Sequence, residues 1–278
     1  MDAADLTFKT AAQALEARYG SHAPAGPTTP AIETMLAHRS VRAYLPDAVP
    51  DEVLAMAVAA AQSAATSSNL QAWSLVAVRD PARKARLAEL AGGQAHLVEA
   101  PLFLVWLIDL NRLRSLAADR EVPSEALDYT EVFLLGAVDA SLAAQNAAVA
   151  LESLGLGTVY IGGMRNQPEA VAELLTLPPG VFALYGMAVG YPDPARPADI
   201  KPRLPQAAVL FEETYDWGPA QVEAVKAYDE VLRAFQAQQK MRPQDWSAQA
   251  TSRIAGPQTL SGRHVLRAVL ERMGFELK

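Results

Sequence analysis

The chain of 278 residues is 51% hydrophobic and 20% charged, with 31 acidic residues against 24 Lys and Arg and a formal net charge of -7. This length and apolar content are typical of a soluble globular protein of one or two domains, and they exclude disorder over most of the chain. The absence of cysteine excludes disulfides, thiolate metal sites and iron–sulfur clusters. The acidic balance argues against nucleic acid as a partner, so we expect any bound anion to be small and locally held.

The first thirty residues are predicted to form an extension. Residues 5–19 have the pattern of a short amphipathic helix, and residues 21–30, rich in Pro, Gly, Ser and Thr, that of a linker. Asp2 and Asp5 stand where a signal peptide would carry basic residues, so we expect a cytoplasmic protein. The most apolar runs, 100–108 and 140–151, are shorter than the ~20 residues needed to span a bilayer, so no membrane contact is expected.

From residue 31 to about residue 216, helical and extended patterns alternate, which indicates a mixture of helices and strands. Helices are predicted at 31–38, 50–65 and 81–91. Strands are predicted at 73–79, 101–108, 157–161 and 182–190.

A long helix is predicted within 124–154, a segment rich in Ala, Leu and Val, ending at Gly155–Gly157. Its few polar residues are spread sparsely, so we expect it to be buried on most sides, in the core or in a subunit interface. Helices are also predicted at 219–239, 245–254 and 258–273, with no strand in this part except in the last four residues. This helical tail packs either on a neighbouring subunit or on its own core.

Several kinds of chemistry are missing from the sequence. The four histidines lie far apart and without carboxylates at ligand spacing, so no catalytic metal is expected. Neither a GxxxxGK[ST] loop nor a GxSxG elbow occurs. The glycines at 155, 157, 162 and 163 follow a helix and bracket a strand, which disfavours a Rossmann dinucleotide site.

Basic and hydroxyl side chains gather at the ends of predicted elements. His38, Arg39, Ser40 and Arg42 lie where a helix ends and an extended stretch begins, a pattern that favours binding of a small anion. The alternative is that these cations only complement the helix dipole. A second pair, Lys201 and Arg203, lies in a proline-stiffened loop that could equally be a solvated surface loop.

Two turns offer further polar or backbone groups. Residues 66–71 place hydroxyl and amide groups between a helix and a strand, as an ordinary turn also can. Residues 160–165 end a strand with Gly162 and Gly163, which would allow the backbone to approach a flat ligand, although a plain strand-to-helix turn has the same pattern.

Five motifs in order along the chain resemble the nitroreductase superfamily. The motifs are HRSVRAY (38–44), ATSSNLQAW (65–73), GGQAH (92–96), AQNAAVALESLGLGTVYIGGMRN (144–166) and DIKPRLP (199–205). Within the superfamily they are most similar to the NADPH-preferring branch of oxygen-insensitive nitroreductases and flavin reductases. The resemblance covers roughly residues 31–250.

The resemblance implies an α+β fold with a central, mostly antiparallel sheet flanked by helices. It also implies a homodimer that holds one FMN per subunit, with the helical C-terminal part embracing the partner. The extension would then be residues 1–30, and the FMN-binding domain residues 31–278.

The resemblance also implies roles for particular residues. The FMN phosphate and ribityl chain would be bound by His38, Arg39, Ser40, Lys201 and Arg203. The pyrimidine edge of the ring would meet Arg42 and Gln94. The turn that lines ring and ribityl would be Thr66, Ser67, Ser68 and Asn69. The other ring edge would run along Tyr160, Ile161, Gly162, Gly163 and Met164. The 2′-phosphate of NADPH would meet Lys240 and Arg242.

The implied activity is a two-electron, ping-pong oxidoreductase in which NADPH reduces FMN and an acceptor then reoxidises it. Hydride transfer at FMN N5 would need no catalytic side chain, with Arg42 and Gly163 assisting. The acceptors would be nitroaromatics, quinones or free flavin. Two alternatives are a flavin-binding protein of the same fold without nicotinamide turnover, and a structural dimer that has lost the cofactor.

Overall fold

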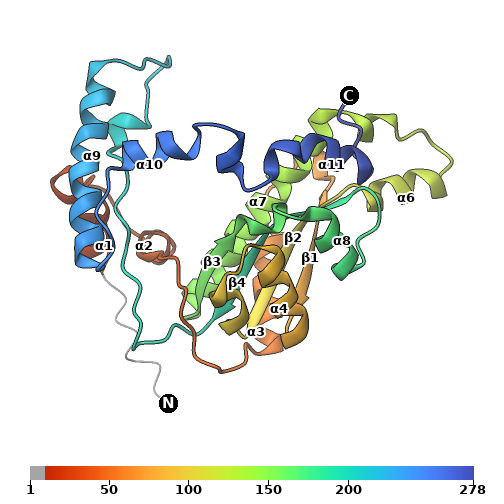
Figure 1. Ribbon diagram of the computed structural model, residues 1–278, viewed down its shortest axis with the longest axis horizontal. Helices are drawn as coiled ribbons and strands as arrows, with labels where there is room; N and C mark the ends of the chain where they lie inside the picture. The colour runs from red at the N-terminus through yellow and green to blue at the C-terminus, as the bar shows by residue number, and fades with distance from the viewer. Residues whose placement is uncertain (1–9) are drawn as a thin grey trace. The chain divides into compact units, whose positions relative to one another are not determined.

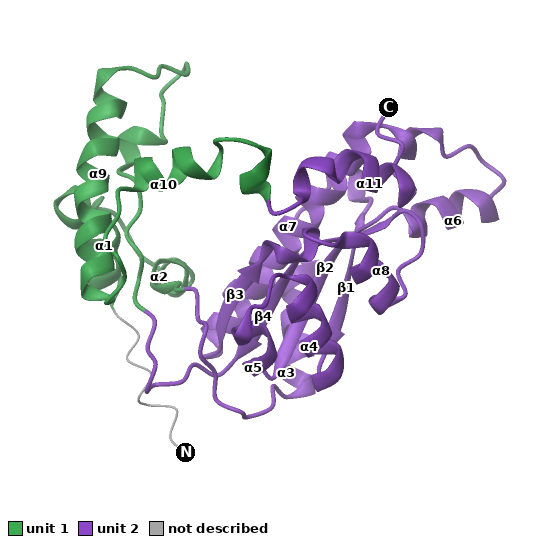
Figure 2. Cartoon of the chain, viewed as in Figure 1, with its two compact units in different colours: residues 1–39, 199–260 green, residues 40–198, 261–278 purple. Residues whose placement is uncertain are grey.

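The computed structural model describes residues 10–278. The chain divides into two compact units, coloured separately in Figure 2. Unit 1 comprises the chain up to Arg39 together with residues 199–260, and unit 2 comprises residues 40–198 and 261–278.

Unit 2 is built on a four-stranded antiparallel sheet, as the resemblance implies. The strand order is β1-β2-β4-β3 (Figure 1). The strands are β1 (Trp73–Val78), β2 (Leu102–Asp109), β3 (Gly157–Ile161) and β4 (Val181–Gly190). Each lies within one residue of its predicted bounds, because continuous apolar runs of this length favour buried strands.

Both faces of the sheet are buried, and β2 shows how. Phe103 and Val105 point into a core that includes residues of α4 (Pro81–Leu90), α5 (Ala95–Glu99) and α8 (Pro168–Leu175). Leu104 and Trp106 point to the other face, against α3 (Asp51–Gln62) and α7 (Thr130–Ser153). Since strand side chains alternate between faces, this continuous apolar strand needs a helical layer on each side.

Helix α7 differs from its prediction in its burial. One face of small residues, such as Ala143 and Ala147, packs on α3 and β2. The opposite face exposes Leu134, Val138 and Leu142, at 54%, 55% and 42%. The expectation of burial on most sides therefore fails along this one exposed face of the single chain, whereas Val132, Phe133 and Leu135 near the start of the helix also pack on a buried cluster of unit 2.

Helix α7 is also the one helix among residues 10–278 that is long and apolar enough to cross a membrane. Its packing on the sheet and on α3 is that of a core helix in a globular unit.

The remaining helices of unit 2 are α6 (Asn111–Asp119) and α11 (Leu266–Arg272). Helices α5, α6 and α8 have no counterpart in the sequence prediction. The helix predicted at 258–273 is instead two 3₁₀ turns followed by α11, because Ser261 and Gly262 both have positive φ and interrupt it. The last four residues form no strand.

Unit 1 contains α1 (Ala11–Tyr19), α2 (Pro30–Ala37), α9 (Pro219–Gln238) and α10 (Trp246–Arg253). Helix α1 starts at a capping box formed by Thr10 and Gln13. It confirms the predicted N-terminal helix over its described part, and residues 5–9 lie outside the described residues. Helix α10 is joined to α9 by Asp229, which accepts hydrogen bonds from the N–H and hydroxyl of Ser247 at 2.8 and 2.6 Å.

Candidate functional site

Unit 1 brings together two basic segments that are far apart in the sequence. Helix α2 ends at Ala37, one residue before the predicted end, and His38 follows as its C-cap in a non-helical conformation. The buried Arg18 of α1 donates to the carbonyl oxygens of His38, at 2.7 Å, and of Lys201, at 3.2 Å. The segments 38–39 and 201–203 are therefore held by one guanidinium.

The guanidinium groups of Arg39 and Arg203 are not paired with a carboxylate anywhere in residues 10–278. Arg39 donates to Ala37 O at 3.5 Å, and Arg203 donates to Pro202 O at 3.2 Å. By contrast, Arg233 of the same unit forms an ion pair with Asp245. Two cations without a counter-ion on adjacent segments leave a net positive charge for an anion.

Unit 1 also contains a cavity of about 540 Å³ beside these segments. Lys201 and Arg203 line it together with aromatic side chains of α1, α9 and α10: Tyr19, Tyr228, Phe235 and Trp246. A cavity with cations and aromatic faces suits an anionic ligand that carries a flat ring.

In unit 2, Arg42 projects from a fixed extended segment. The N–H of Val41 donates to Thr158 O at 3.0 Å, and Ser40 bridges to Thr158 in parallel. Tyr44 is buried and its hydroxyl donates to Val41 O at 2.7 Å. Arg42 is exposed and bonds only Ser40 O, at 3.3 Å, within the described chain.

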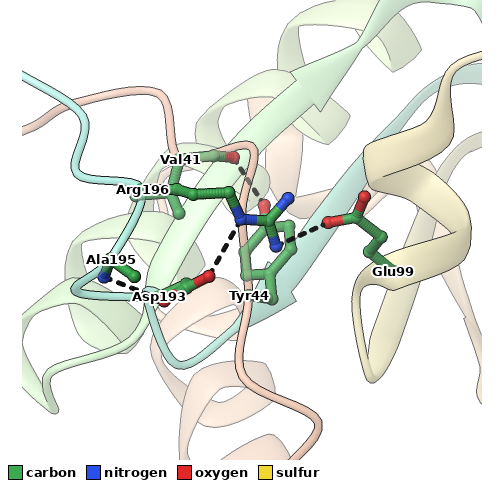
Figure 3. A network of polar contacts seen from close by, with 6 residues as sticks. All are labelled: Val41, Tyr44, Glu99, Asp193, Ala195 and Arg196. Atoms are coloured by element: carbon green, nitrogen blue, oxygen red, sulfur yellow. Dashed lines mark hydrogen bonds and ion pairs between the residues drawn. The ribbon is translucent and has the colours of Figure 1, made fainter.

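Arg196, in contrast to Arg42, is paired with carboxylates. Figure 3 shows Arg196 between two carboxylates, with Nε donating to Asp193 at 2.9 Å and Nη2 to Glu99 at 3.0 Å. The ion pairs hold the loop after β4 against the end of α5. These carboxylates neutralise the charge of Arg196. Arg42 has no carboxylate partner within the described chain, so its charge can interact with a bound anion.

Arg42 lies close to the GGQAH segment. Burial lowers the pKa of the His96 imidazole, the positive charge of Arg42 lowers it further, and Glu99 opposes the change. His96 Nε2 is buried and has no hydrogen-bond partner within residues 10–278. Gln94, two residues earlier, is half-buried and its Nε2 donates to Ala91 O at 3.1 Å. The charge of Arg42 therefore reaches His96, two residues after Gln94.

The paired-glycine turn packs directly on the same segment. A Cβ on Gly163 would lie 2.5 Å from Ala91 O and 2.9 Å from Gln94 Nε2, so no other residue fits there. Gly92 and Gly93 adopt φ of 92° and 78°, which glycine alone reaches without strain. Unit 2 thus gathers Arg42, Gln94 and Gly163, three residues that the sequence separates widely.

The turn 66–69 is placed by Asp139, a residue that the sequence analysis did not single out. Asp139 is buried, with 2% of the residue exposed. It accepts hydrogen bonds from Thr66 Oγ1 at 2.6 Å, Ser67 N at 3.2 Å and Ala72 N at 3.0 Å. The sequence does contain a sign of this role, because Asp139 is a single carboxylate in an otherwise apolar stretch of helix. A charge buried in such a helix requires hydrogen-bond partners.

Backbone strain accompanies this turn. Ser68 and Asn69 both have positive φ, at 49° and 54°, which is uncommon outside glycine. Such conformations persist only where surrounding contacts impose them, and they concentrate at functional sites.

The strand that leads to the paired glycines carries Tyr160. Its hydroxyl donates to Gln145 Oε1 at 3.3 Å, and its ring packs edge-on against Tyr185 at 5.3 Å. Burial raises the pKa of the Tyr160 hydroxyl, so it stays protonated. Ile161 and Met164 are buried in the core and act as anchors of the turn.

Lys240 and Arg242 follow the end of α9 and are both exposed. Met241, between them, lines the cavity described above. Lys240 and Arg242 thus flank a residue that lines this cavity of unit 1.

These features define an α+β protein with two groups of candidate ligand-binding residues, one of cations in unit 1 and one of polar side chains and backbone in unit 2. Among residues 10–278, no three His, Asp or Glu side chains gather where they could hold a metal ion.

Comparison with known proteins identifies the family. Residues 35–191 match the model of the nitroreductase family, and residues 201–278 match that of its C-terminal domain. The chain belongs to the nitroreductase family. It is 39% identical over 227 residues to an NADPH-flavin oxidoreductase of Vibrio harveyi, covering 81% of this chain and 91% of the relative. It is 41% identical over 207 residues to an oxygen-insensitive NADPH nitroreductase of Salmonella typhimurium, covering 74% and 82%.

Solved structures show the same fold. A hypothetical oxidoreductase of Bacillus subtilis superposes with a TM-score of 0.85 at 36% identity, covering 90% of this chain and 100% of that one. The NADPH:FMN oxidoreductase of Vibrio harveyi in complex with NAD⁺ gives a TM-score of 0.79 at 36% identity, with the same coverage. The fold and family implied by the five sequence motifs are thus confirmed.

Proposed function

We propose that this protein is an FMN-dependent NAD(P)H oxidoreductase that reduces nitroaromatics, quinones or free flavin by two-electron, ping-pong turnover. Relatives of 39–41% identity are named NADPH-flavin oxidoreductase, FMN reductase (NADPH) and NADPH nitroreductase. The observation that carries the proposal in this chain is the pair of cations, Arg39 and Arg203, on segments that Arg18 holds together.

The residues present fit FMN on two counts. A phosphate dianion needs charge-assisted donors, and Arg39 and Arg203 have no carboxylate partner in the described chain. A flat ring needs close backbone approach, and the atoms nearest to a virtual Cβ on Gly162 belong to the flexible side chains of Arg165, at 3.3 Å, and Arg263, at 3.7 Å.

These positions support the following assignment of roles. We assign the phosphate and ribityl chain to His38, Arg39, Ser40, Lys201 and Arg203. We assign the pyrimidine edge to Arg42 and Gln94, since the charge of Arg42 reaches His96, two residues after Gln94. Thr66, Ser67, Ser68 and Asn69 would line the ring and ribityl chain, with the Thr66 hydroxyl engaged by Asp139. The backbone of Tyr160–Met164 would line the other ring edge.

When bound, FMN would supply the hydride chemistry of the reaction. The protein itself would contribute charge and space around the ring. The cation of Arg42 would stabilise negative charge that develops at the pyrimidine edge, and Gly163 would leave the ring edge open. No proton-transferring side chain is required.

Lys240 and Arg242 would bind the 2′-phosphate that distinguishes NADPH from NADH. Both are exposed and neither forms an ion pair within the described chain. We propose NADPH as the preferred reductant on this basis, and a cytoplasmic location, where that reductant is present.

We also propose a homodimer. Leu134, Val138 and Leu142 follow each other at intervals of four residues, so they form one exposed apolar stripe along α7. A stripe of large apolar side chains on a long helix marks a surface that a second protein covers. The helical tail, residues 219–278, would embrace the partner.

One experiment tests the function. The purified protein is expected to show the visible absorbance of bound flavin and to oxidise NADPH in the presence of a nitroaromatic or a quinone. Bound flavin without NADPH oxidation would instead support a flavin-binding protein that lacks nicotinamide turnover. A colourless protein that stays colourless after incubation with FMN would contradict the proposal.

A further inference from the structure

Arg18 connects the N-terminal extension to both segments that carry the proposed phosphate ligands. Its side chain is only 6% exposed. Its Nε donates to Leu36 O at 3.0 Å, Nη2 to His38 O at 2.7 Å and Nη1 to Lys201 O at 3.2 Å. One side chain thus bridges residues that are 163 positions apart, from 38 to 201.

The main chain of Arg18 adds a fourth contact. The N–H of Arg203 donates to Arg18 O at 2.9 Å. From α9, the buried Tyr228 hydroxyl donates to Pro202 O at 3.0 Å. Residues 201–203 are therefore fixed by α1 and by α9, and all of these contacts lie within unit 1.

The geometry of guanidinium explains why arginine is needed here. Its donors lie in one rigid plane, so three carbonyl groups bound to it hold fixed positions relative to each other. The peptide bond is planar and trans, so fixing the carbonyl of His38 also fixes the direction of the Arg39 N–H, on the opposite side. A lysine has one ammonium on a flexible stem and cannot impose this arrangement.

We propose that Arg18 is a positioning residue for the FMN phosphate, which makes the N-terminal extension part of the cofactor site. The inference rests on the proposed function, since it acts through His38, Arg39, Lys201 and Arg203. Arg18 itself faces carbonyl oxygens, and its effect on the phosphate is exerted through the two segments that it holds.

The test compares FMN with riboflavin, which lacks the phosphate. Dissociation constants are measured by quenching of flavin fluorescence on addition of apoprotein. We expect Arg18→Met to raise the constant for FMN by about ten- to hundredfold, as when one or two charge-assisted hydrogen bonds are lost. The constant for riboflavin, which keeps the ribityl chain but lacks the phosphate, is expected to rise much less. The matched control is Arg233→Met, which breaks the ion pair with Asp245 in the same unit.

A double mutant shows whether Arg18 acts through Arg203. If it does, Arg18→Met costs less FMN affinity in an Arg203→Ala background than in the wild type. Arg18→Lys, which keeps the charge but not the planar fork, is expected to recover only part of the affinity. If circular dichroism shows that Arg18→Met does not fold, Arg18→Lys replaces it in the comparison of FMN with riboflavin.

The outcomes are distinct. Equal losses for FMN and riboflavin would overturn the inference, because they would indicate a general structural role. Unchanged FMN binding in the Arg18 variants, with weakened binding in Arg203→Ala, would overturn the inference and leave the proposed function intact. A wild-type protein that binds neither flavin would overturn both.

Discussion

At the scale of single residues, the arginines divide by their partners. Arg196 and Arg272 are used in ion pairs with carboxylates, which hold elements together. Arg39, Arg42 and Arg203 bond only nearby carbonyl oxygens within the described chain. This difference separates structural cations from candidate ligand-binding cations, and composition alone does not reveal it.

Arg242 should act on the reductant and not on the cofactor. Arg242→Ala is expected to raise the KM for NADPH by about tenfold, because a charge-assisted contact to the 2′-phosphate is lost. The KM for NADH, which has no 2′-phosphate, should change little, and so should flavin content. Steady-state kinetics with both nucleotides measure this, and equal effects on the two would contradict the assignment.

His96 should make the stability of the apoprotein depend on pH. Burial and the Arg42 charge lower its pKa below the ordinary value of 6.5, so below that pH the unfolded state binds more protons than the folded state. The free energy of unfolding therefore decreases as the pH falls through about 6.5, and it goes on decreasing until the pH reaches the lowered pKa of His96 in the folded state.

His96→Gln removes this proton linkage. We expect its Tm to fall less than that of the wild type between about pH 7.5 and about pH 5.5. His264→Gln, at an exposed position of the same unit, is the matched control. Identical losses of Tm in His96→Gln and wild type would argue against a lowered pKa at His96.

At the scale of elements, α7 organises the turn between α3 and β1. The Asp139 carboxylate accepts three hydrogen bonds from residues 66–72 while it is buried against them. The strained conformations of Ser68 and Asn69 are thus held by a helix more than sixty residues later. The shape of this part of the candidate site depends on one carboxylate.

Asp139→Ala leaves the buried N–H of Ala72, the partly buried N–H of Ser67 and the Thr66 hydroxyl without their acceptor. We expect a loss of about 3 kcal/mol in the free energy of unfolding, because each unsatisfied buried donor costs ~1–3 kcal/mol. Urea unfolding of the apoprotein measures it. Glu131→Ala, at an exposed acid on the same helix, should cost less than ~1 kcal/mol. A similar small effect for Asp139→Ala would show that the turn forms without it.

At the scale of the whole molecule, the exposed stripe on α7 is the feature that a single chain leaves unexplained. Helix α7 buries its alanine face on the sheet and presents Leu134, Val138 and Leu142 outward. A second copy of the chain covering this stripe would remove large apolar side chains from water, at ~25 cal/mol per Å².

Val138→Glu places a charge in the middle of the stripe and should dissociate the proposed dimer. Size-exclusion chromatography with light scattering is expected to give the dimer mass for the wild type and the monomer mass for the variant. Val98→Glu, at an exposed valine of α5, should keep the wild-type mass. A monomeric wild type, or a dimeric Val138→Glu, would contradict the assigned interface.

The sequence by itself determined the strands, the long helix and the family. Apolar runs such as 102–108 are readable because their burial is encoded locally, and the five motifs are readable because their order is specific. Helices α5, α6 and α8 were missed, since short helices depend on packing more than on their own periodicity.

Only the tertiary structure decided which residues meet. The three carbonyl groups held by Arg18, the turn held by Asp139 and the approach of Gly163 to Gln94 join segments far apart in the chain. No local pattern carries such pairings, because a hydrogen bond or a close contact depends on distance in space and not on separation in sequence. For the same reason, the sequence could not show that the face of α7 with Leu134, Val138 and Leu142 stays exposed, which depends on what the other elements leave uncovered.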